Sequence, residues 1–422
     1  MNFIGIFCLV TPKSLHLSMR QYFTHRNFYL LGLILVAVGL SLSPALMSIG
    51  QAVLLLNWIF EAEFASKIKS IKTNYYLLAF ISIFLIHILG LLYTSNFYYA
   101  TNDLKIKVPL LILPIIIGST SPLTRVELKY ILYSLIISVL GSSLYSLSIY
   151  STIDNGNVDT LRNISPIISH IRLSLIICVS LFAIIYLVLK SEKKIVSVFN
   201  IILIVIALWF FIFIGILGAR AGYLALLCCA AAIFIYQIVA AKKWKYVIVL
   251  ILATVLIPFL MYKYVPSVSQ RINEARTEVN HYKAGGNPSG HSITQRFEYW
   301  KIAKHIFESN PIIGVGTGDI DDEFKLFYAT HDTPIKKEFQ FRAHNQYFTI
   351  LSTFGIVGFL VFITAFLFPY FKGVEKYSLL PTVFIIITML SMLTEDTLET
   401  QAGATFVSFF FSIFLLSAFK KK

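Results

Sequence analysis

Residues 197–240 read SVFNIILIVIALWFFIFIGILGARAGYLALLCCAAAIFIYQIVA. Two apolar runs flank a single arginine, Arg220, and each is about 20 residues long, the length of a helix that crosses a lipid bilayer. Inside a bilayer the backbone must hydrogen-bond to itself, so such runs fold as helices. The stretch therefore predicts two antiparallel membrane helices joined by a tight turn, and an all-α fold class.

The same apolar pattern recurs along the whole chain. Hydrophobic residues make up 57% of the 422 residues and charged residues only 13%, whereas soluble domains carry about 25% charged residues. We therefore predict a polytopic integral membrane protein with about 12 transmembrane helices. The expected spans are 28–43, 44–60, 74–95, 107–118, 128–150, 166–189, 197–218, 221–240, 246–263, 345–370, 378–394 and 402–418.

The net charge of +14 indicates orientation in the lipid bilayer rather than nucleic-acid binding. Most basic residues lie in short clusters between apolar runs, and not on the face of one domain. The clusters occupy alternate connections, as the positive-inside rule expects of cytoplasmic loops. Both termini are therefore predicted to be cytoplasmic. Lys105 and Lys107 are exceptions, because they lie at the outer mouth of the fourth expected span.

One long polar segment interrupts the spans, and we predict that it is a periplasmic loop containing a helix. The expected organisation is a cytoplasmic tail at 1–27, nine spans within 28–263, the loop at 264–343, three spans within 344–418 and a cytoplasmic tail at 419–422. The loop sequence predicts an amphipathic helix over 294–310 that ends before Pro311. Its expected apolar face carries Phe297, Trp300, Ala303, Ile306 and Phe307.

Several cationic residues gather on the predicted outer face, where charged groups near the membrane are costly and often functional. They are His170, Arg172, Arg220, Arg296, Arg342 and His344. A lone arginine near the membrane surface often only extends its guanidinium into the aqueous interface. Three separated arginines together with a histidine instead favour an anion-binding site beside a proton acceptor. The cysteines and the loop histidines lack metal-ligand spacing, so neither a metal nor another cofactor is predicted.

Two motifs resemble the O-antigen ligase and polymerase superfamily. His344-Asn345, nine residues and then Gly355-Ile356-Val357-Gly358 is similar to the family pattern of a histidine, a small polar residue, nine residues and Gly-x-x-Gly. Arg220 and Leu224 match the family's Arg-x-x-x-Leu, and the resemblance covers mainly residues 165–370. Phe359 departs from the ligase pattern, which usually has Thr, Val or Tyr there, so the choice between ligase and sister enzymes stays open. For the two glycines themselves we prefer a packing role, since small residues allow helices to approach closely.

The resemblance implies a glycosyltransferase that needs no metal or other cofactor. Members transfer a glycan from an undecaprenyl-diphosphate-linked donor to an acceptor hydroxyl, with inversion, at the periplasmic face of the bacterial inner membrane. By carry-over, His344 is the general base, and the diphosphate ligands are Arg220, Arg172 and Arg296. The supporting residues are His170, Asn345 and Arg342.

The acceptor stays open at this stage. Lipid A-core would make the protein a ligase, which we favour, whereas a second glycan would make it a polymerase and a protein acceptor a protein O-oligosaccharyltransferase. A membrane transporter or flippase is the alternative from another class. Carriers place charged sites near the middle of the membrane and often show two related halves, and the sequence shows neither feature.

Overall fold

The computed structural model describes residues 24–150, 165–192, 196–239, 256, 259–260, 262–264, 266–371 and 378–417, and contains no β-strand within them. The prediction of an all-α fold is confirmed. The helices are α2 (His25–Leu42), α3 (Pro44–Phe60), α4 (Phe64–Thr73), α5 (Tyr75–Leu89), η1 (Gly90–Tyr93), α6 (Phe97–Lys107), α7 (Pro109–Ser119), α8 (Arg125–Tyr150), α10 (His170–Leu189), α11 (Val198–Leu217), α12 (Arg220–Val239), α14 (Pro266–Lys283), α15 (Thr294–Ser309), α16 (Ile320–Thr330), η2 (Lys337–Phe339), α17 (Gln346–Phe371), α18 (Leu379–Thr394), η3 (Thr397–Glu399), α19 (Gln401–Phe411) and η4 (Ser412–Leu416).

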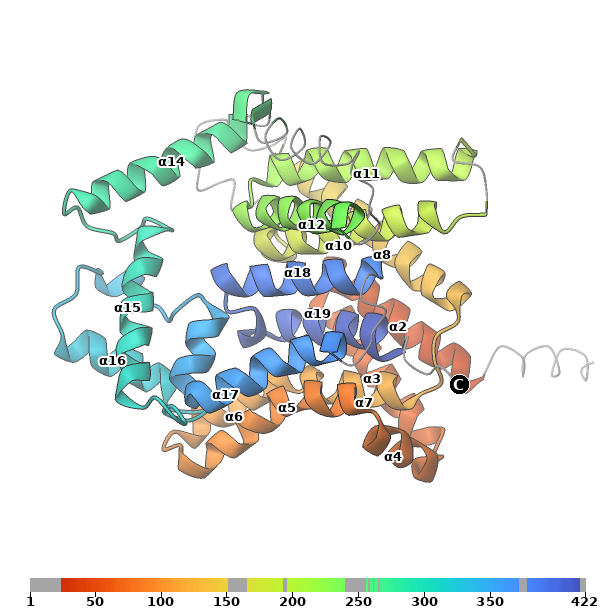
Figure 1. Cartoon of the computed structure of the whole chain (residues 1–422), viewed down its shortest axis with the longest axis horizontal. Coiled ribbons are helices and arrows are strands. Elements are labelled where there is room, and N and C mark those ends of the chain that lie inside the picture. Colours follow the sequence, from red (N-terminus) through yellow and green to blue (C-terminus); the bar gives the residue numbers. More distant parts are fainter. Residues whose placement is uncertain are drawn as a thin grey trace, which may run out of the picture.

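The long apolar helices lie side by side in a bundle, and the polar helices α14, α15 and α16 gather at one end of it (Figure 1). The short helix α4, which carries Lys67, Lys69 and Lys72, lies toward the other end (Figure 1). Segments that the charge pattern predicts for opposite sides of a membrane thus lie at opposite ends of the bundle.

Among the described residues, six helices are long and apolar enough to cross a membrane: α2, α5 with η1, α8, α10, α11 and α17. The pair α3 and α4, bent by 115°, would make a seventh if it forms one span. Three further apolar helical stretches, Arg220–Ile235 of α12, Leu379–Thr394 of α18 and Gln401–Leu416 of α19 and η4, are shorter. These helices indicate a multi-pass membrane protein, while the total of about 12 spans stays a prediction.

Two of the expected spans differ from the rest. The fourth corresponds to α7, which has 11 residues and contains Pro114. At 1.5 Å per residue it reaches about 17 Å, roughly half of the hydrocarbon thickness of a bilayer, so α7 alone is too short to cross. Most of the expected ninth span, 246–263, lies outside the described residues, as do residues 1–23 of the first predicted tail and all of the second, 419–422.

The predicted loop helix is α15, and it ends at Asn310 as expected. Its buried face is rotated from the predicted one, because one side of the helix packs against α16 and α17. Phe297 and Trp300, which the pattern placed on the buried face, are only partly buried. The apolar residues actually buried are Tyr299, Ile302, Ala303 and Ile306.

A break in α17 anchors the segment that follows α15. Gly355 has a φ of 62°, and four backbone hydrogen bonds of 2.8–3.2 Å join residues 352–357 to residues 311–316. The predicted close approach therefore exists at Gly355, but its partner is this segment instead of a second helix, and an added Cβ atom on Gly358 would meet only Phe354 of its own helix. A Cβ atom on Gly355 would lie 2.3 Å from the backbone carbon of Ile312, so the site requires glycine.

The unexpected position of Lys107 is explained by ion pairs inside the protein. Its side chain is 1% exposed and pairs with Asp103 on the same helix and with Glu399, at 2.9 Å. Lys105 is exposed and donates to the side chain of Asn102 at 3.3 Å. Because Lys107 is neutralised internally, it does not act as a free charge in the orientation of the chain.

We expect Gly355→Ala to destabilise the protein, because a left-handed backbone costs a non-glycine residue about 1–2 kcal/mol and the new Cβ atom also clashes. Gly141→Ala is the matched control. Gly141 lies in α8 with nothing within 4 Å of an added Cβ atom, and alanine favours helix by up to about 1 kcal/mol. Thermal unfolding in detergent should show a lower Tm for the first variant only, and equal Tm values would contradict this account.

Lys107→Met should destabilise the protein by about 3–5 kcal/mol, because it leaves the buried carboxyl group of Asp103 without its cation and leaves Glu399 with only Arg342, at 3.7 Å. Lys105→Met, two residues away and exposed, should change the stability by less than about 0.5 kcal/mol. Chemical unfolding of both variants in detergent measures the difference. A Lys107→Met protein as stable as the Lys105→Met protein would show that the ion pairs do not support the fold.

Candidate functional site

Two adjoining cavities lie where the loop helices meet the bundle. The first, the arginine cavity, has a volume of about 490 Å³. Its lining includes His170, Arg220, Ser292, Gln295, Arg296, Phe297, Trp300, Phe339, Phe341 and Glu395. The second, the histidine cavity, has a volume of about 530 Å³. Its lining includes Arg172, Asp321, Lys325, Tyr328, Lys337, Phe341, Arg342, His344, Glu395, Asp396 and Glu399. Phe341 and Glu395 belong to both walls, so the two cavities share a border.

Three helices begin at the arginine cavity. Gly218, with a φ of 62°, ends α11 and turns the chain so that Arg220 is the first residue of α12. His170 is the first residue of α10, and α15 begins at Thr294, next to Gln295 on the cavity wall. The first N–H groups of a helix have no partner within the helix and attract anions. The arrangement therefore favours a negatively charged ligand.

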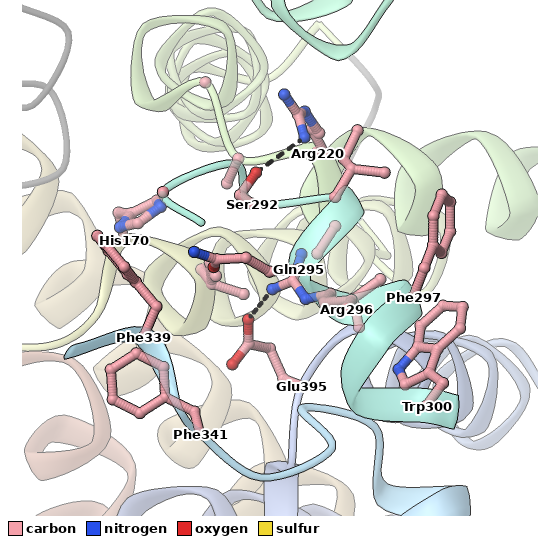
Figure 2. A pocket seen from close by; sticks show the side chains of 17 residues that line it. His170, Arg220, Ser292, Gln295, Arg296, Phe297, Trp300, Phe339, Phe341 and Glu395 are labelled. Atoms are coloured by element: carbon pink, nitrogen blue, oxygen red, sulfur yellow. Dashed lines mark hydrogen bonds and ion pairs between the residues drawn. The ribbon is translucent and has the colours of Figure 1, made fainter. Parts of the chain in front are cut away.

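The two arginines of this cavity have different partners. Arg220 donates from Nη1 to the hydroxyl of Ser292 at 3.3 Å, and Arg296 pairs through Nη2 with Glu395 at 2.9 Å (Figure 2). Figure 2 also shows aromatic side chains on two sides, which are Phe339 and Phe341 on one side and Phe297 and Trp300 on the other. The cavity thus combines cationic groups with flat apolar surfaces.

Glu395 connects the two cavities electrostatically. Burial raises the pKa of its carboxyl group, and the charges of Arg296, His344 and Arg172 oppose that rise. Arg296 belongs to the arginine cavity, whereas His344 and Arg172 belong to the histidine cavity. One carboxyl group therefore interacts with cationic groups from both sides.

Sequence reasoning missed the acidic members of the site. It did not identify Glu395, Asp396 or Glu399 as site residues. Burial raises the pKa of Asp396, as does the neighbouring Glu399. For Glu399 burial acts in the same direction, but Lys107 and Arg342 outweigh it and hold the pKa of Glu399 below its usual range. The available signal was three acidic residues within five positions, beside apolar helices where charge is costly.

Three aromatic donors hold the segment that leads to His344. The carbonyl groups of residues 339, 341 and 343 accept hydrogen bonds of 2.5, 2.8 and 3.1 Å from Tyr299, Tyr328 and Trp300, respectively. His344 itself has a φ of 46°, one of three positive values at non-glycine residues in the described chain. Such a conformation persists only where the surroundings impose it, and it is common at functional sites. The backbone at His344 is therefore held by the fold.

Asn345 follows His344 in the chain and lines neither cavity. Its Oδ1 accepts from the backbone N–H groups of residues 347 and 348 at 3.0 and 3.3 Å, which caps the start of α17. Its Nδ2 donates to the carbonyl of Leu393 at 3.0 Å, and its own N–H donates to Asp396 at 3.1 Å. The residue predicted to assist the chemistry thus anchors α17 to the loop of Glu395.

Arg342 is also engaged within the protein. Its Nη1 donates to the hydroxyl of Tyr99 at 2.6 Å and lies 3.7 Å from Glu399. Burial disfavours the charged guanidinium, but Glu399 and Tyr99 outweigh it and raise the pKa of Arg342. Arg342 therefore joins the segment before His344 to the same carboxyl group that binds Lys107.

The structure divides the predicted site residues between the two cavities. Arg220, Arg296 and His170 line the first, while Arg172, Arg342 and His344 line the second. The three predicted diphosphate ligands do not all line one cavity, because Arg172 lines only the second. Within the described residues no group of three or more His, Cys, Asp or Glu side chains is arranged to hold a metal ion.

Residues 205–363 match the family model described as O-antigen ligase. The matched range runs from α11 through α15 and α16 into α17. It contains Arg220, Arg296 and His344, but ends before Glu395. The match supports the O-antigen ligase and polymerase superfamily for this chain. No curated protein matches the chain.

Asn345→Ala should lower the free energy of unfolding by about 1 kcal/mol, because it removes the cap of α17. Asn345→Ser keeps a capping oxygen and should recover part of that loss. Urea unfolding in detergent compares the two variants with the wild-type protein. If the alanine and serine variants were equally stable, the side chain of Asn345 would not act as a cap.

Proposed function

We propose that this protein transfers a glycan from undecaprenyl diphosphate to an acceptor hydroxyl, with lipid A-core as the acceptor. The observation that supports this most is the shared border of the two cavities. An anion-attracting cavity with aromatic walls meets a second cavity that holds His344, and Glu395 lies between them. A donor and an acceptor bound in adjoining spaces would meet at that border.

The arginine cavity suits a sugar diphosphate. Arg220 offers a guanidinium that remains charged and binds phosphate oxygens in a fork, close to the starts of three helices. Arg296 is held by Glu395 at 2.9 Å, so it has a fixed orientation toward the donor. Trp300 and Phe341 provide the flat apolar surfaces against which sugar rings pack. Arg172, on the other side of Glu395, would meet the diphosphate only at the border.

His344 is the proposed general base. It takes the proton of the acceptor hydroxyl as that oxygen forms a bond to the anomeric carbon of the donor glycan. The bond from the anomeric carbon to the diphosphate oxygen breaks, and its electron pair leaves with the diphosphate. Attack from the face opposite the leaving group inverts the anomeric centre.

Nearby charges favour both halves of this step. The diphosphate gains charge as it leaves, and arginines already oriented toward it stabilise that charge without rearranging. His344 becomes an imidazolium, and its charge interacts with the carboxyl groups of Glu395 and Asp396. These two acidic residues therefore stabilise the protonated base, and no metal or other cofactor is needed.

We place this site at the periplasmic face of the bacterial inner membrane. In this arrangement residues 264–343 form the periplasmic loop, and both termini lie in the cytoplasm. The support is the position of α14, α15 and α16 at the end of the bundle away from the lysines of α4 (Figure 1). Lipid-linked donors would then enter the cavities from the outer leaflet.

His344→Ala should reduce glycan transfer by about 10²–10⁴-fold, the usual contribution of a general base. Arg220→Lys should also impair transfer, because lysine lacks the forked geometry. The matched control is His331→Ala, since His331 is exposed on the loop and lines neither cavity. Purified protein would receive a lipid-diphosphate-linked repeat unit, and product would be followed by gel shift. Wild-type activity in His344→Ala at equal expression would refute the proposed base.

A panel of acceptors tests the identity of the acceptor. Product on lipid A-core supports the proposed ligase. Product only on a second lipid-linked repeat unit would show a polymerase instead, and product only on a protein serine or threonine a protein O-oligosaccharyltransferase. Movement of the donor across vesicles, with no transfer to any acceptor, would establish a flippase and overturn the proposal.

A further inference from the structure

Gln295 has a buried amide nitrogen for which the described residues supply no acceptor. The residue is 9% exposed and lies on the wall of the arginine cavity. Within the described part of the chain, its Nε2 has no hydrogen-bond partner. A buried donor without an acceptor costs free energy. Other buried side-chain oxygens in the described chain also lack a partner, but Gln295 is the residue among them that lines one of the two cavities. A ligand in the adjacent cavity would supply the missing acceptor.

The neighbours of Gln295 are already occupied with each other. Arg296 pairs with Glu395 at 2.9 Å, and Ser292 accepts from Arg220 at 3.3 Å. Figure 2 shows the Gln295 amide turned away from the Arg296–Glu395 pair, toward the side of the cavity where His170 and Phe339 lie. The cationic groups and the Gln295 amide thus face different parts of the arginine cavity.

The chemistry of this position fits a sugar better than a phosphate. A primary amide is uncharged, and it donates readily to hydroxyl or carbonyl oxygens. Ligand sites combine apolar and aromatic walls with a few polar groups that fix orientation and provide specificity. Here Phe339 and Phe341 supply the aromatic surface, and Gln295 supplies the polar group.

We propose that Gln295 is a specificity-determining residue, whose Nε2 donates to a hydroxyl or acetamido oxygen of the sugar bound to the carrier diphosphate. The proposal rests on the proposed function, since it assigns the sugar-binding part of the same cavity. Gln295 would distinguish donors by their first sugar, while Arg220 would bind every donor through its diphosphate.

The test compares two probes that differ only in the sugar. Undecaprenyl diphosphate bearing N-acetylglucosamine and bare undecaprenyl diphosphate are titrated into the full-length protein in nanodiscs. Gln295→Leu should bind the sugar-bearing probe about tenfold more weakly, the usual loss for one hydrogen bond to a ligand, and the bare probe as the wild-type protein does. Arg220→Gln should weaken the binding of both probes. Gln401→Leu, at an exposed glutamine outside both cavities, should change neither.

The variant should also fold normally. Leucine keeps the approximate size of glutamine and removes the unpartnered donor, so the Tm of Gln295→Leu should equal or exceed that of the wild-type protein. Equal weakening of both probes would show that Gln295 binds phosphate, and unchanged binding of both would show no contact, so either result overturns the proposal. If the wild-type protein binds neither probe, the proposed function itself fails, and the role of Gln295 fails with it.

Discussion

The carboxyl group of Glu395 is partly buried at the common border of two cavities, and cationic groups from both cavities act on it. Burial alone would favour the neutral acid, but Arg296, His344 and Arg172 oppose this effect. The ion pair with Arg296 joins the loop helix α15 to the turn after α18. Glu395 and Phe341 together form the wall that the arginine and histidine cavities share. The arrangement of the site therefore depends strongly on one acidic side chain between two apolar helices.

A second set of buried charges holds the framework around that group. Lys107 and Arg342 both pair with Glu399, which brings α6, the segment before His344 and η3 together. Asn345 ties the start of α17 to the same turn through Leu393 and Asp396. Breaking a buried ion pair costs far more than breaking an exposed one. The cost of holding His344 in a left-handed conformation is offset by these contacts and by the aromatic donors of α15 and α16.

The local sequence pattern was sufficient to predict the fold class and several of the candidate site residues. Long apolar runs predicted the helices, Pro311 predicted the end of α15, and Arg220 and His344 stood out because charges beside apolar runs are costly. The rotation of α15 was not predictable in this way, because Phe297 and Trp300 look as apolar as Ile302. Which face is buried depends on packing against α16 and α17, and the partly buried aromatics instead line the arginine cavity. Gln295 gave no signal at all, since a glutamine near a helix start is common in any polar segment.

The sequence by itself determined that this chain folds as membrane helices and that residues 264–343 form a polar segment between them. It also determined which motifs the chain shares with the O-antigen ligase and polymerase superfamily. These properties follow from composition and local spacing, because the bilayer imposes the same demand on every apolar run. Only the tertiary structure decided that the cationic residues divide between two cavities, and that Glu395 lies on their border. Such relations join residues far apart in the sequence, as Arg296 and Glu395 are at 99 positions, and their energies depend on burial and distance, which no local pattern encodes.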